Sequence, residues 1–356
     1  MAKVSFNDVT ISAIVTTIGN HKVDIEDEQN KYGFDDKTLN RLKKTIGFGS
    51  RYIVGDGICA SDLCCQSAVT LFDNIDLKKD EIDGLIFVTQ SPDYRAPSTA
   101  IIMQDRLGLS IDTVAYDINL GCSGFVYGLF NGFAFINCGF RKVLLLVGDV
   151  SNYFTKKDKT FTPLMGDAGS AVLIEKGGGN KSCFVLHSNG SGYKHLIIPA
   201  GGARMECSEE TLKLVERDDG SLRRECDLYM NGAEVFNFAV KTVPGLIEEL
   251  FESSNISKNE VDYFVLHQAN YYILKNIARK LGISENKVPM ETAKVYGNQN
   301  SASIPGTING YLSNEYSEKL LRSVFAGFGI GLSWAACYVT TDNIFAPVVR
   351  KFNNVL

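Results

Sequence analysis

An internal repeat restricts the folds open to this chain more than any other feature of its sequence. Residues 260–266, Glu-Val-Asp-Tyr-Phe-Val-Leu, resemble residues 81–87, Glu-Ile-Asp-Gly-Leu-Ile-Phe, at an offset of 179 positions. A helical pattern follows each of these apolar runs and ends in a similar way, with Arg-Leu-Gly-Leu at 106–109 and Lys-Leu-Gly-Ile at 280–283. The spacing between matched segments drifts by several residues, but their order is kept. We therefore predict two similar halves.

Each half is predicted to be an α/β unit, with residues 1–175 in the first and 176–356 in the second. Strand-length apolar runs alternate with helical patterns, an order that is typical of parallel or mixed sheets covered by helices. Residues 177–224 are rich in glycine and charge, and we expect them to run over the surface. The pattern predicts strands at 4–18, 82–88, 113–118, 143–147, 261–266 and 322–326, and helices at 35–46, 61–72, 97–107 and 125–130.

Two of the predicted helices carry start signals. Ser61 or Asp62 is expected to cap the helix at 61–72, and Pro97 is expected to lie in the first turn of the helix at 97–107.

Composition excludes several classes of protein. A content of 45% hydrophobic and 22% charged residues is ordinary for a soluble globular chain, and a formal net charge of −5 argues against nucleic acid as the main partner. That charge still allows an acidic partner to dock on a local basic patch. The longest apolar runs, such as residues 142–148, are too short to span a bilayer, and the N-terminus lacks a signal-peptide core, so we expect a cytoplasmic protein without membrane contacts.

The cysteines do not indicate a disulfide framework or a zinc site. They are nine in number, scattered along the chain, and none forms a Cys-x-x-Cys pair. Cys122 stands apart, because it lies in Asn-Leu-Gly-Cys-Ser-Gly-Phe at 119–125, between a predicted strand and a predicted helix. Gly121 and Gly124 permit a tight turn there, and the N–H groups at the helix start would favour the reactive thiolate. The alternative is a buried cysteine that acts as a small apolar residue.

Two further polar residues belong to the same prediction. His267 directly follows the apolar run at 261–266, and the carboxyl end of an α/β strand is where ligands bind; the alternative is a histidine that caps the next helix. Asn298 lies 179 residues after Asn119, in a Gly-Asn pair that in isolation is more often a turn than a site. A pseudo-twofold relation between the halves would bring Cys122, His267 and Asn298 together.

These residues lie in motifs that resemble a known family. The ordered set Gly-Cys-Ser-Gly-Phe, His-Gln-Ala-Asn, Gly-Asn-x-x-Ser-Ala-Ser-Ile-Pro and Phe-Gly-Ile-Gly-Leu-Ser-Trp resembles that of the β-ketoacyl-acyl carrier protein synthase III family of the thiolase superfamily. The resemblance covers nearly the whole chain. It implies a five-layered αβαβα homodimer built of two duplicated halves. It also implies no metal or cofactor, because the substrates are carried on coenzyme A or on the phosphopantetheine of acyl carrier protein.

The resemblance implies a role for each matched residue. Cys122 is the nucleophile that takes an acyl group from a thioester. Decarboxylation of a malonyl thioester then creates an enolate, whose charge His267 and Asn298 stabilise by donating hydrogen bonds. When the enolate attacks the acyl-cysteine, the backbone N–H groups of Cys122 and Ile330 form the oxyanion hole, Ile330 standing where the family often has glycine. The reaction is a decarboxylative Claisen condensation in fatty acid or related acyl-chain biosynthesis.

The sequence departs from the family at its substrate-binding positions. The family stacks the coenzyme A adenine on a tryptophan near the end of the first helix, whereas the only tryptophan here is Trp334 and Arg41 would have to stack instead. The acyl donor, coenzyme A or carrier protein, is thus left open. Ala96 replaces a bulky phenylalanine that closes the acyl pocket from the partner subunit, which predicts acyl chains longer than acetyl or branched. Phe236 and Asn270 are further substrate-binding candidates.

The carrier-docking surface also differs. The family has a basic residue just after its His-Gln-Ala-Asn motif, where this chain has Tyr271 and Tyr272. Lys275, Arg279 and Lys280 on the following helix could take over carrier docking. The alternative is an ordinary solvated helix face.

Two other functions remain open from sequence. One is an acyltransferase that passes the cysteine-bound acyl group to an alcohol or an amine, although Asn298 favours condensation. The other is a non-catalytic partner subunit, which the presence of all three site residues disfavours. A hydroxymethylglutaryl-coenzyme A synthase would need a catalytic glutamate that the sequence does not place. Either a housekeeping or a specialised pathway, such as polyketide or surface-glycan acyl synthesis, is compatible with the motifs.

Overall fold

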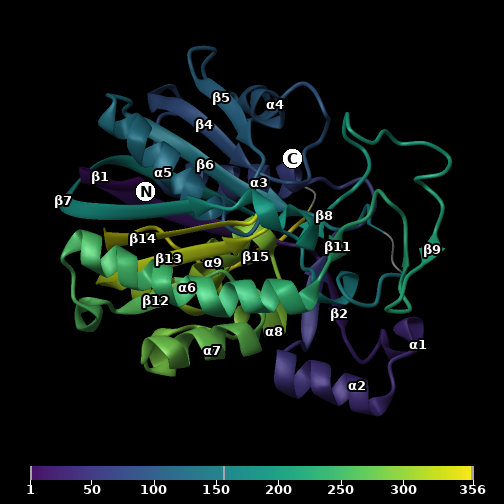
Figure 1. The fold of residues 1–356 in the computed structure, drawn as a ribbon. Helices are drawn as coiled ribbons and strands as arrows, with labels where there is room; N and C mark the ends of the chain where they lie inside the picture. Colours follow the sequence, from purple (N-terminus) through teal and green to yellow (C-terminus); the bar gives the residue numbers. More distant parts are fainter. Residues whose placement is uncertain (1, 155–156, 354–356) are drawn as a thin grey trace.

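The computed structural model describes residues 2–154 and 157–353. Figure 1 shows a layered α/β molecule in which two sheets are enclosed by helices. The strands of the first half are β1 (Ala2–Ile18), β4 (Ile82–Val88), β5 (Val114–Ile118), β6 (Lys142–Asp149) and β7 (Ala168–Ser188). Their order in the sheet is β5–β4–β6–β7–β1, with β4, β5 and β6 parallel and β7 antiparallel to both of its neighbours.

The second half repeats this order, and β7 takes part in both halves. Its strands are β12 (Tyr263–Leu266), β13 (Leu320–Gly329) and β14 (Ser333–Asp342), and the order continues as β12–β13–β14–β7. The first part of β7, up to Glu175, pairs with β6, and its last part, from Cys183, pairs with β14. Thus the end of β7 occupies the place in the second half that β1 occupies in the first.

This arrangement corrects the expected surface excursion. Residues 177–188 belong to β7, because their backbone pairs with β1 and β14, so the excursion begins only at residue 189. The boundary predicted between residues 175 and 176 lies within this one strand, near the point where it changes partner.

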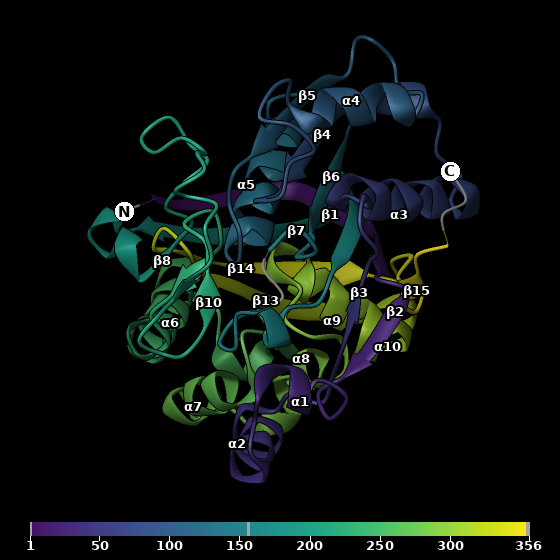
Figure 2. The ribbon, with the colours of Figure 1, turned by 90° about the vertical axis from the view of Figure 1, so that its right-hand side faces the viewer.

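The layers follow from alternation along the strands. In β6, Val143 and Leu145 point to the central layer, which holds helices α5 (Gly124–Asn137) and α9 (Ser303–Tyr311), whereas Leu144 points to the outer face. Helices α3 (Ala60–Asn74) and α4 (Thr99–Arg106) cover that outer face, and α6 (Gly232–Ser254) and α7 (Tyr271–Leu281) cover the far side of the second sheet. Figure 2 shows the two outer pairs on opposite sides. The five-layered αβαβα fold of two duplicated halves is confirmed.

Shorter elements complete the chain. The remaining strands are β2 (His21–Asp24), β3 (Ser50–Ile53), β8 (Leu196–Ile197), β9 (Val215–Glu216), β10 (Leu222–Arg223), β11 (Tyr229–Met230) and β15 (Arg350–Lys351). The remaining helices are α1 (Gln29–Tyr32), α2 (Asp36–Arg41), α8 (Thr292–Tyr296), α10 (Ser313–Glu318) and the short helices η1 (Leu42–Ile46), η2 (Lys79–Glu81), η3 (Thr162–Leu164), η4 (Gly190–His195), η5 (Lys258–Glu260), η6 (Glu285–Lys287) and η7 (Asn300–Ala302). The helix predicted at 35–46 is confirmed as α2 followed by η1.

Two predicted helix starts are wrong. Helix α3 is capped by Cys59, whose N–H donates to the Asp62 carboxylate at 2.8 Å, rather than by Ser61 or Asp62. Pro97 precedes α4, which begins at Thr99 because the Asp117 carboxylate of β5 accepts hydrogen bonds from the first N–H groups of the helix, that of Thr99 at 2.7 Å.

Among the residues that the structure describes, no helix is both long and apolar enough to cross a bilayer.

The packing of α3 on β7 generates a stability prediction. A Cβ on Gly169 would lie 2.5 Å from the backbone nitrogen of Cys64, so Gly169→Ala should lower the free energy of unfolding by about 1–3 kcal/mol through overpacking. Gly245→Ala in α6 is the matched control, because no atom lies within 4 Å of the added methyl group there. The control should be neutral or raise stability by up to about 1 kcal/mol. Urea unfolding measures both, and an equal response would contradict the packing argument.

Candidate active site

Cys122 lies in the turn between β5 and α5, where the two halves of the molecule meet. The helix starts at Gly124, and β13 of the second half runs directly against the cysteine. A Cβ on Gly329 would be only 2.8 Å from the Cys122 sulfur, and one on Gly327 would be 2.8 Å from the Cys122 carbonyl oxygen. Side chains are thus sterically excluded from this part of β13, and glycine lets its backbone reach the sulfur.

Asn300 connects the three predicted site residues. The Cys122 thiol donates to the Asn300 side-chain oxygen at 3.2 Å, and the Asn300 N–H donates to the Asn298 side-chain oxygen at 3.0 Å. The Asn300 backbone also forms a hydrogen bond with His267. The chain turns at Asn300 with φ of 48°, a left-handed conformation that asparagine tolerates better than most residues. Cys122, His267 and Asn298 therefore converge on one residue, as the repeat predicts.

His267 is buried at the end of β12, at the start of the segment that leads to α7. Its Nδ1 lies 2.7 Å from the Ser303 hydroxyl oxygen at the start of α9. Burial lowers the pKa of His267 to about 3, so the imidazole is neutral at physiological pH and carries one N–H donor. Capping is left to Asn270, whose side chain accepts from the Ile273 N–H at 2.8 Å, so the alternative of a helix-capping histidine is wrong.

The expected thiolate at Cys122 is wrong for the free protein. Burial, and to a smaller extent the nearby Asp149 carboxylate, raises the pKa of the thiol to about 12. Backbone N–H groups of Ile330 and Cys122 itself act in the opposite direction. These are the two groups assigned to the oxyanion hole by resemblance, and they lie at the sulfur. The N–H groups at the start of α5 do not offset the effect of desolvation on the pKa of the Cys122 thiol.

The turn that carries Ile330 is fixed from both sides. The Ser333 hydroxyl donates to the Ile330 carbonyl oxygen at 2.8 Å, and it lies 2.7 Å from the Ser123 hydroxyl oxygen. Ser123, which follows the nucleophile, thus helps through Ser333 to hold the turn that supplies the Ile330 N–H group.

Asp149 accepts hydrogen bonds from both halves of the molecule next to the site. It is buried at the end of β6, and desolvation raises the pKa of its carboxyl to about 6 despite several donors. The Gln90 N–H donates to it at 2.7 Å, and the Ser301 hydroxyl donates at 2.9 Å. Ser301 is the position that the 179-residue offset pairs with Cys122. Asp149 therefore positions the segment 298–301 against the first half.

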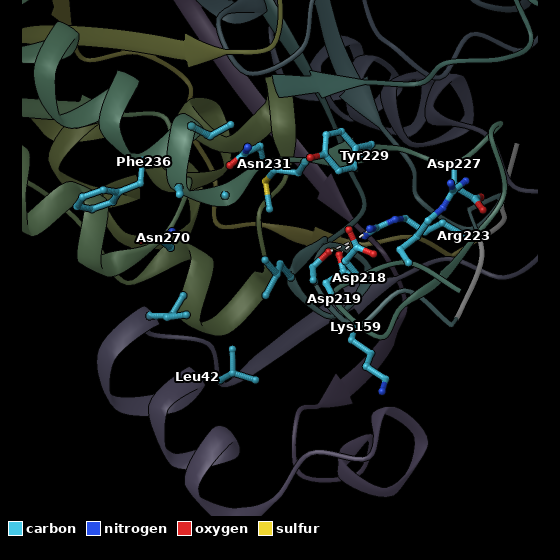
Figure 3. A pocket seen from close by; sticks show the side chains of 18 of the residues that line it. Leu42, Lys159, Asp218, Asp219, Arg223, Asp227, Tyr229, Asn231, Phe236 and Asn270 are labelled. Carbon is cyan, nitrogen blue, oxygen red and sulfur yellow. Dashed lines mark hydrogen bonds and ion pairs between the residues drawn. The ribbon is translucent and has the colours of Figure 1, made fainter. Parts of the chain in front are cut away.

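A large cavity approaches this centre from the surface. Its volume is about 1430 Å³, and its walls come from α2 and η1, from the start of α6 and α7, and from the excursion between residues 189 and 231. Arg41, Phe236 and Asn270, three of the predicted substrate-binding residues, line it. In Figure 3 Phe236 and Asn270 lie on the opposite side of the view from Asp218, Asp219 and Arg223. Two further wall residues, Met230 and Val235, pack against the same apolar cluster as Ile330, whereas Cys122, His267 and Asn298 do not line the cavity.

The charges around the cavity balance. Its basic side chains are Arg41, Lys159, Arg217, Arg223 and Arg224, and its acidic ones are Glu216, Asp218, Asp219, Glu225 and Asp227. Three of the arginines are held in ion pairs, for example Arg223 with Asp219 at 2.6 Å. Arg41 and Lys159 form no ion pair within the described residues, so their positive charges remain available to an anionic ligand.

The other predicted residues lie away from the sulfur. Ala96 is exposed in the loop before α4 and does not line the cavity of its own chain. Lys275, Arg279 and Lys280 are exposed on α7. Lys275 lies 3.5 Å from Glu285, and Lys280 donates to the Val240 carbonyl oxygen, which leaves Arg279 without an acidic partner among residues 2–154 and 157–353.

Sequence reasoning missed Asn300, Asp149 and Gln90 as members of the site. Asn300 lies within the quoted Gly-Asn motif, but at one of the two positions that the motif leaves open. Asp149 follows a predicted strand, a signal of the kind used for His267 that could have identified it. Metal binding is not indicated by the described part of the chain, which contains no group of three or more His, Cys, Asp or Glu residues arranged for an ion.

The raised thiol pKa generates a prediction about reactivity. Because the pKa of Cys122 is about 12, the rate of its alkylation by iodoacetamide should rise about tenfold per pH unit from pH 7 to pH 9 without a plateau. Peptide mass spectrometry of the Cys122-containing fragment measures this rate, with Cys122→Ser as the control for peptide assignment. A plateau below pH 9 would show that the thiolate is stabilised in the free protein.

Family models match both halves of the chain. The model for 3-oxoacyl-[acyl-carrier-protein (ACP)] synthase III matches residues 116–190, and the model for the C-terminal part of the same family matches residues 251–341. The first segment contains Cys122, and the second contains His267 and Asn298.

Whole-chain relatives agree with these matches. A Campylobacter jejuni protein, provisionally named a 3-oxoacyl-[acyl-carrier-protein] synthase 3, is 35% identical over 350 residues, which cover 96% of this chain and 97% of that protein. A β-ketoacyl-[acyl-carrier-protein] synthase III of Porphyromonas gingivalis is 32% identical and covers 92% of this chain and 96% of its own. The crystal structure of a 3-oxoacyl-(acyl-carrier protein) synthase from Burkholderia xenovorans LB400 matches with a TM-score of 0.91 at 32% identity, over 98% of this chain and 99% of the other. The chain thus belongs to the 3-oxoacyl-[acyl-carrier-protein] synthase III family of the thiolase superfamily, whose members are acyltransferases of the condensing type.

Proposed function

We propose that this protein condenses an acyl thioester with a malonyl thioester through an acyl group on Cys122, in fatty acid or related acyl-chain biosynthesis. The observation that carries the proposal is the junction at Asn300, which links a cysteine of the first half to a histidine and an asparagine of the second. Family membership supports the same reaction.

The first step transfers the acyl group. The Cys122 sulfur forms a bond to the thioester carbon, the bond from that carbon to the carrier sulfur breaks, and the Cys122 proton ends on the carrier thiol. Since the free thiol has a raised pKa, little thiolate is present before the thioester binds, and we propose that proton loss accompanies attack. The backbone N–H groups of Cys122 and Ile330 are suited to hold the oxyanion, and each such donor is typically worth about 3 kcal/mol of barrier.

The second step generates the carbanion without a base. A malonyl thioester loses CO₂, and the electrons of the broken carbon–carbon bond form an enolate, which then attacks the acyl-cysteine. The neutral His267 carries one N–H, which bonds to the Asn300 backbone in the free protein and would pass to the enolate oxygen when substrate binds. The Asn298 side chain uses its oxygen to accept from Asn300, and its NH₂ group makes no hydrogen bond with the described residues, so it is available as the second donor.

Substrate delivery is proposed to use the large cavity. A phosphopantetheine arm, from carrier protein or from coenzyme A, is long and narrow, and Arg41 offers its phosphate an unpaired cation. Phe236 stacks on Tyr272 with ring centroids 5.4 Å apart, which forms an apolar wall for the arm. No metal or cofactor beyond these carriers enters the proposed reaction.

A homodimer is proposed from the free edge of the first sheet. Strand β5 is the outermost strand of that sheet, and its neighbourhood exposes Ile101, Ile111 and Val114. Pairing of β5 with the same strand of a second copy would continue the sheet and cover these apolar side chains. It would also bring Ala96 of one subunit towards the other.

Separate assays of the two steps test the mechanism. Cys122→Ala should abolish acyl-enzyme formation, measured as a mass increase of the intact protein after incubation with acyl thioester. Asn298→Ala should still form the acyl-enzyme but should lower the condensation rate by about 10²–10³-fold, because it removes one enolate donor. Equal losses in both steps would contradict the role of Asn298 and would favour simple transfer to an alcohol or amine.

Carrier docking generates a second prediction. Helix α7 starts at the cavity with Asn270 and Tyr272, so a carrier bound along it would place its arm at the entrance. Arg279→Glu should raise the KM for malonyl-acyl carrier protein several-fold and weaken its salt dependence, with kcat unchanged. Lys181→Glu on β7 is the control, because that exposed lysine lies far along the chain from α7 and carries the same change in charge. Identical KM values for both variants would exclude docking on α7.

A further inference from the structure

A second, small cavity lies on the first-half side of Cys122. Its volume is about 40 Å³, and Phe154, Phe161, Met165 and Leu228 form its apolar wall. A water-sized group needs about 10–15 Å³ of such volume, so the cavity holds about three or four heavy atoms. The remaining wall includes Gln90 and Asn300, and the Asn300 side-chain oxygen lies 3.2 Å from the Cys122 sulfur, so the cavity lies close to the nucleophile.

The two carboxamides lie directly beside the cysteine turn. A Cβ on Gly121 would be 2.3 Å from the Gln90 side-chain oxygen and 2.9 Å from that of Asn300, so both amides press against the residue before Cys122. The Asn300 oxygen accepts from the Cys122 thiol. The Gln90 amide makes no hydrogen bond with any residue of the described ranges, although it borders an otherwise apolar space.

Apart from the Tyr153 hydroxyl, the other polar groups at this cavity already have partners. Asp149 accepts from the Ser301 hydroxyl at 2.9 Å and from the N–H of Gln90 at 2.7 Å. Asp167 accepts from both the N–H and the hydroxyl of Ser151 at 2.8 Å. The hydrogen-bonding capacity left for a ligand therefore belongs to Tyr153, Gln90 and Asn300, and the last two lie beside the cysteine turn.

Acylation increases that unused capacity. When the sulfur becomes a thioester it loses its proton, and the Asn300 oxygen loses the donor that it has in the free protein. An apolar acyl chain in the cavity would cover these two half-buried amides without offering either a partner, which is unfavourable. A hydroxyl group on the chain can donate to the Asn300 oxygen and accept from the Gln90 NH₂ group.

We propose that the acyl group loaded on Cys122 is a short hydroxyacyl group, with three or four heavy atoms beyond the thioester carbonyl, whose hydroxyl binds between Gln90 and Asn300. The proposal rests on the acyl-cysteine of the proposed function. It specifies the substrate class that the two amides and the small cavity select.

Isosteric substrates test this selectivity. 3-Hydroxybutyryl and 3-methylbutyryl thioesters differ only by a hydroxyl in place of a methyl group, so they have nearly the same shape. Loading of the full-length protein with each, on coenzyme A and on carrier protein, is followed by intact-protein mass spectrometry. We expect 3-hydroxybutyryl to load at least about fivefold faster, since leaving buried polar groups unsatisfied is costly. Equal or faster loading of 3-methylbutyryl would overturn the proposal, whereas failure of both to load would instead count against the acyl-cysteine mechanism.

A variant identifies the residue responsible. Gln90→Leu keeps the backbone N–H that binds Asp149 and should reverse the preference towards 3-methylbutyryl. Gln29→Leu, the same substitution near the N-terminus, should leave the ratio of the two loading rates unchanged. An unchanged ratio in Gln90→Leu would remove Gln90 from the proposal. If that variant failed to fold in a thermal melt, the discrimination ratio of the natural protein would still decide the substrate class.

Discussion

The hydrogen bond between the Cys122 thiol and the Asn300 side chain is the contact on which the site depends. It crosses from the first half of the molecule to the second, and the backbone of the same asparagine reaches Asn298 and His267. The close approach is possible because Gly327 and Gly329 of β13 have no side chains to separate the sheets at this point. The geometry of the nucleophile is therefore a property of the interface between the halves and not of the cysteine turn alone.

Electrostatics at this interface favour neutral groups in the free protein. Burial raises the pKa of the Cys122 thiol and lowers that of His267, so neither residue is charged at neutral pH. Formation of a thiolate–imidazolium pair is thus disfavoured, which suits a histidine that donates a hydrogen bond to an enolate. Charge develops only where substrate brings it, next to backbone N–H groups that are already in place.

The sequence was sufficient for the fold and for the convergence of Cys122, His267 and Asn298, because the repeat and the spacing of the motifs are encoded along the chain. It was insufficient for the protonation state of Cys122, since the desolvation of this thiol depends on strands that are distant in sequence. The same limit applies to Gln90, whose side chain is informative only once Gly121 is seen beside it. The start of α4 was misplaced for a similar reason, because Asp117 of β5 determines it from outside the helix.

Strand β7 limits how the two halves of the molecule can move relative to each other. Since its beginning belongs to the first sheet and its end to the second, no flexible linker separates the halves, and a hinge between them would have to break the ladder with β1. Substrates must therefore enter through motions of side chains and of the peripheral segments around the cavity, while the frame that holds both halves stays rigid. Ancient duplication has in this way produced a single inseparable body.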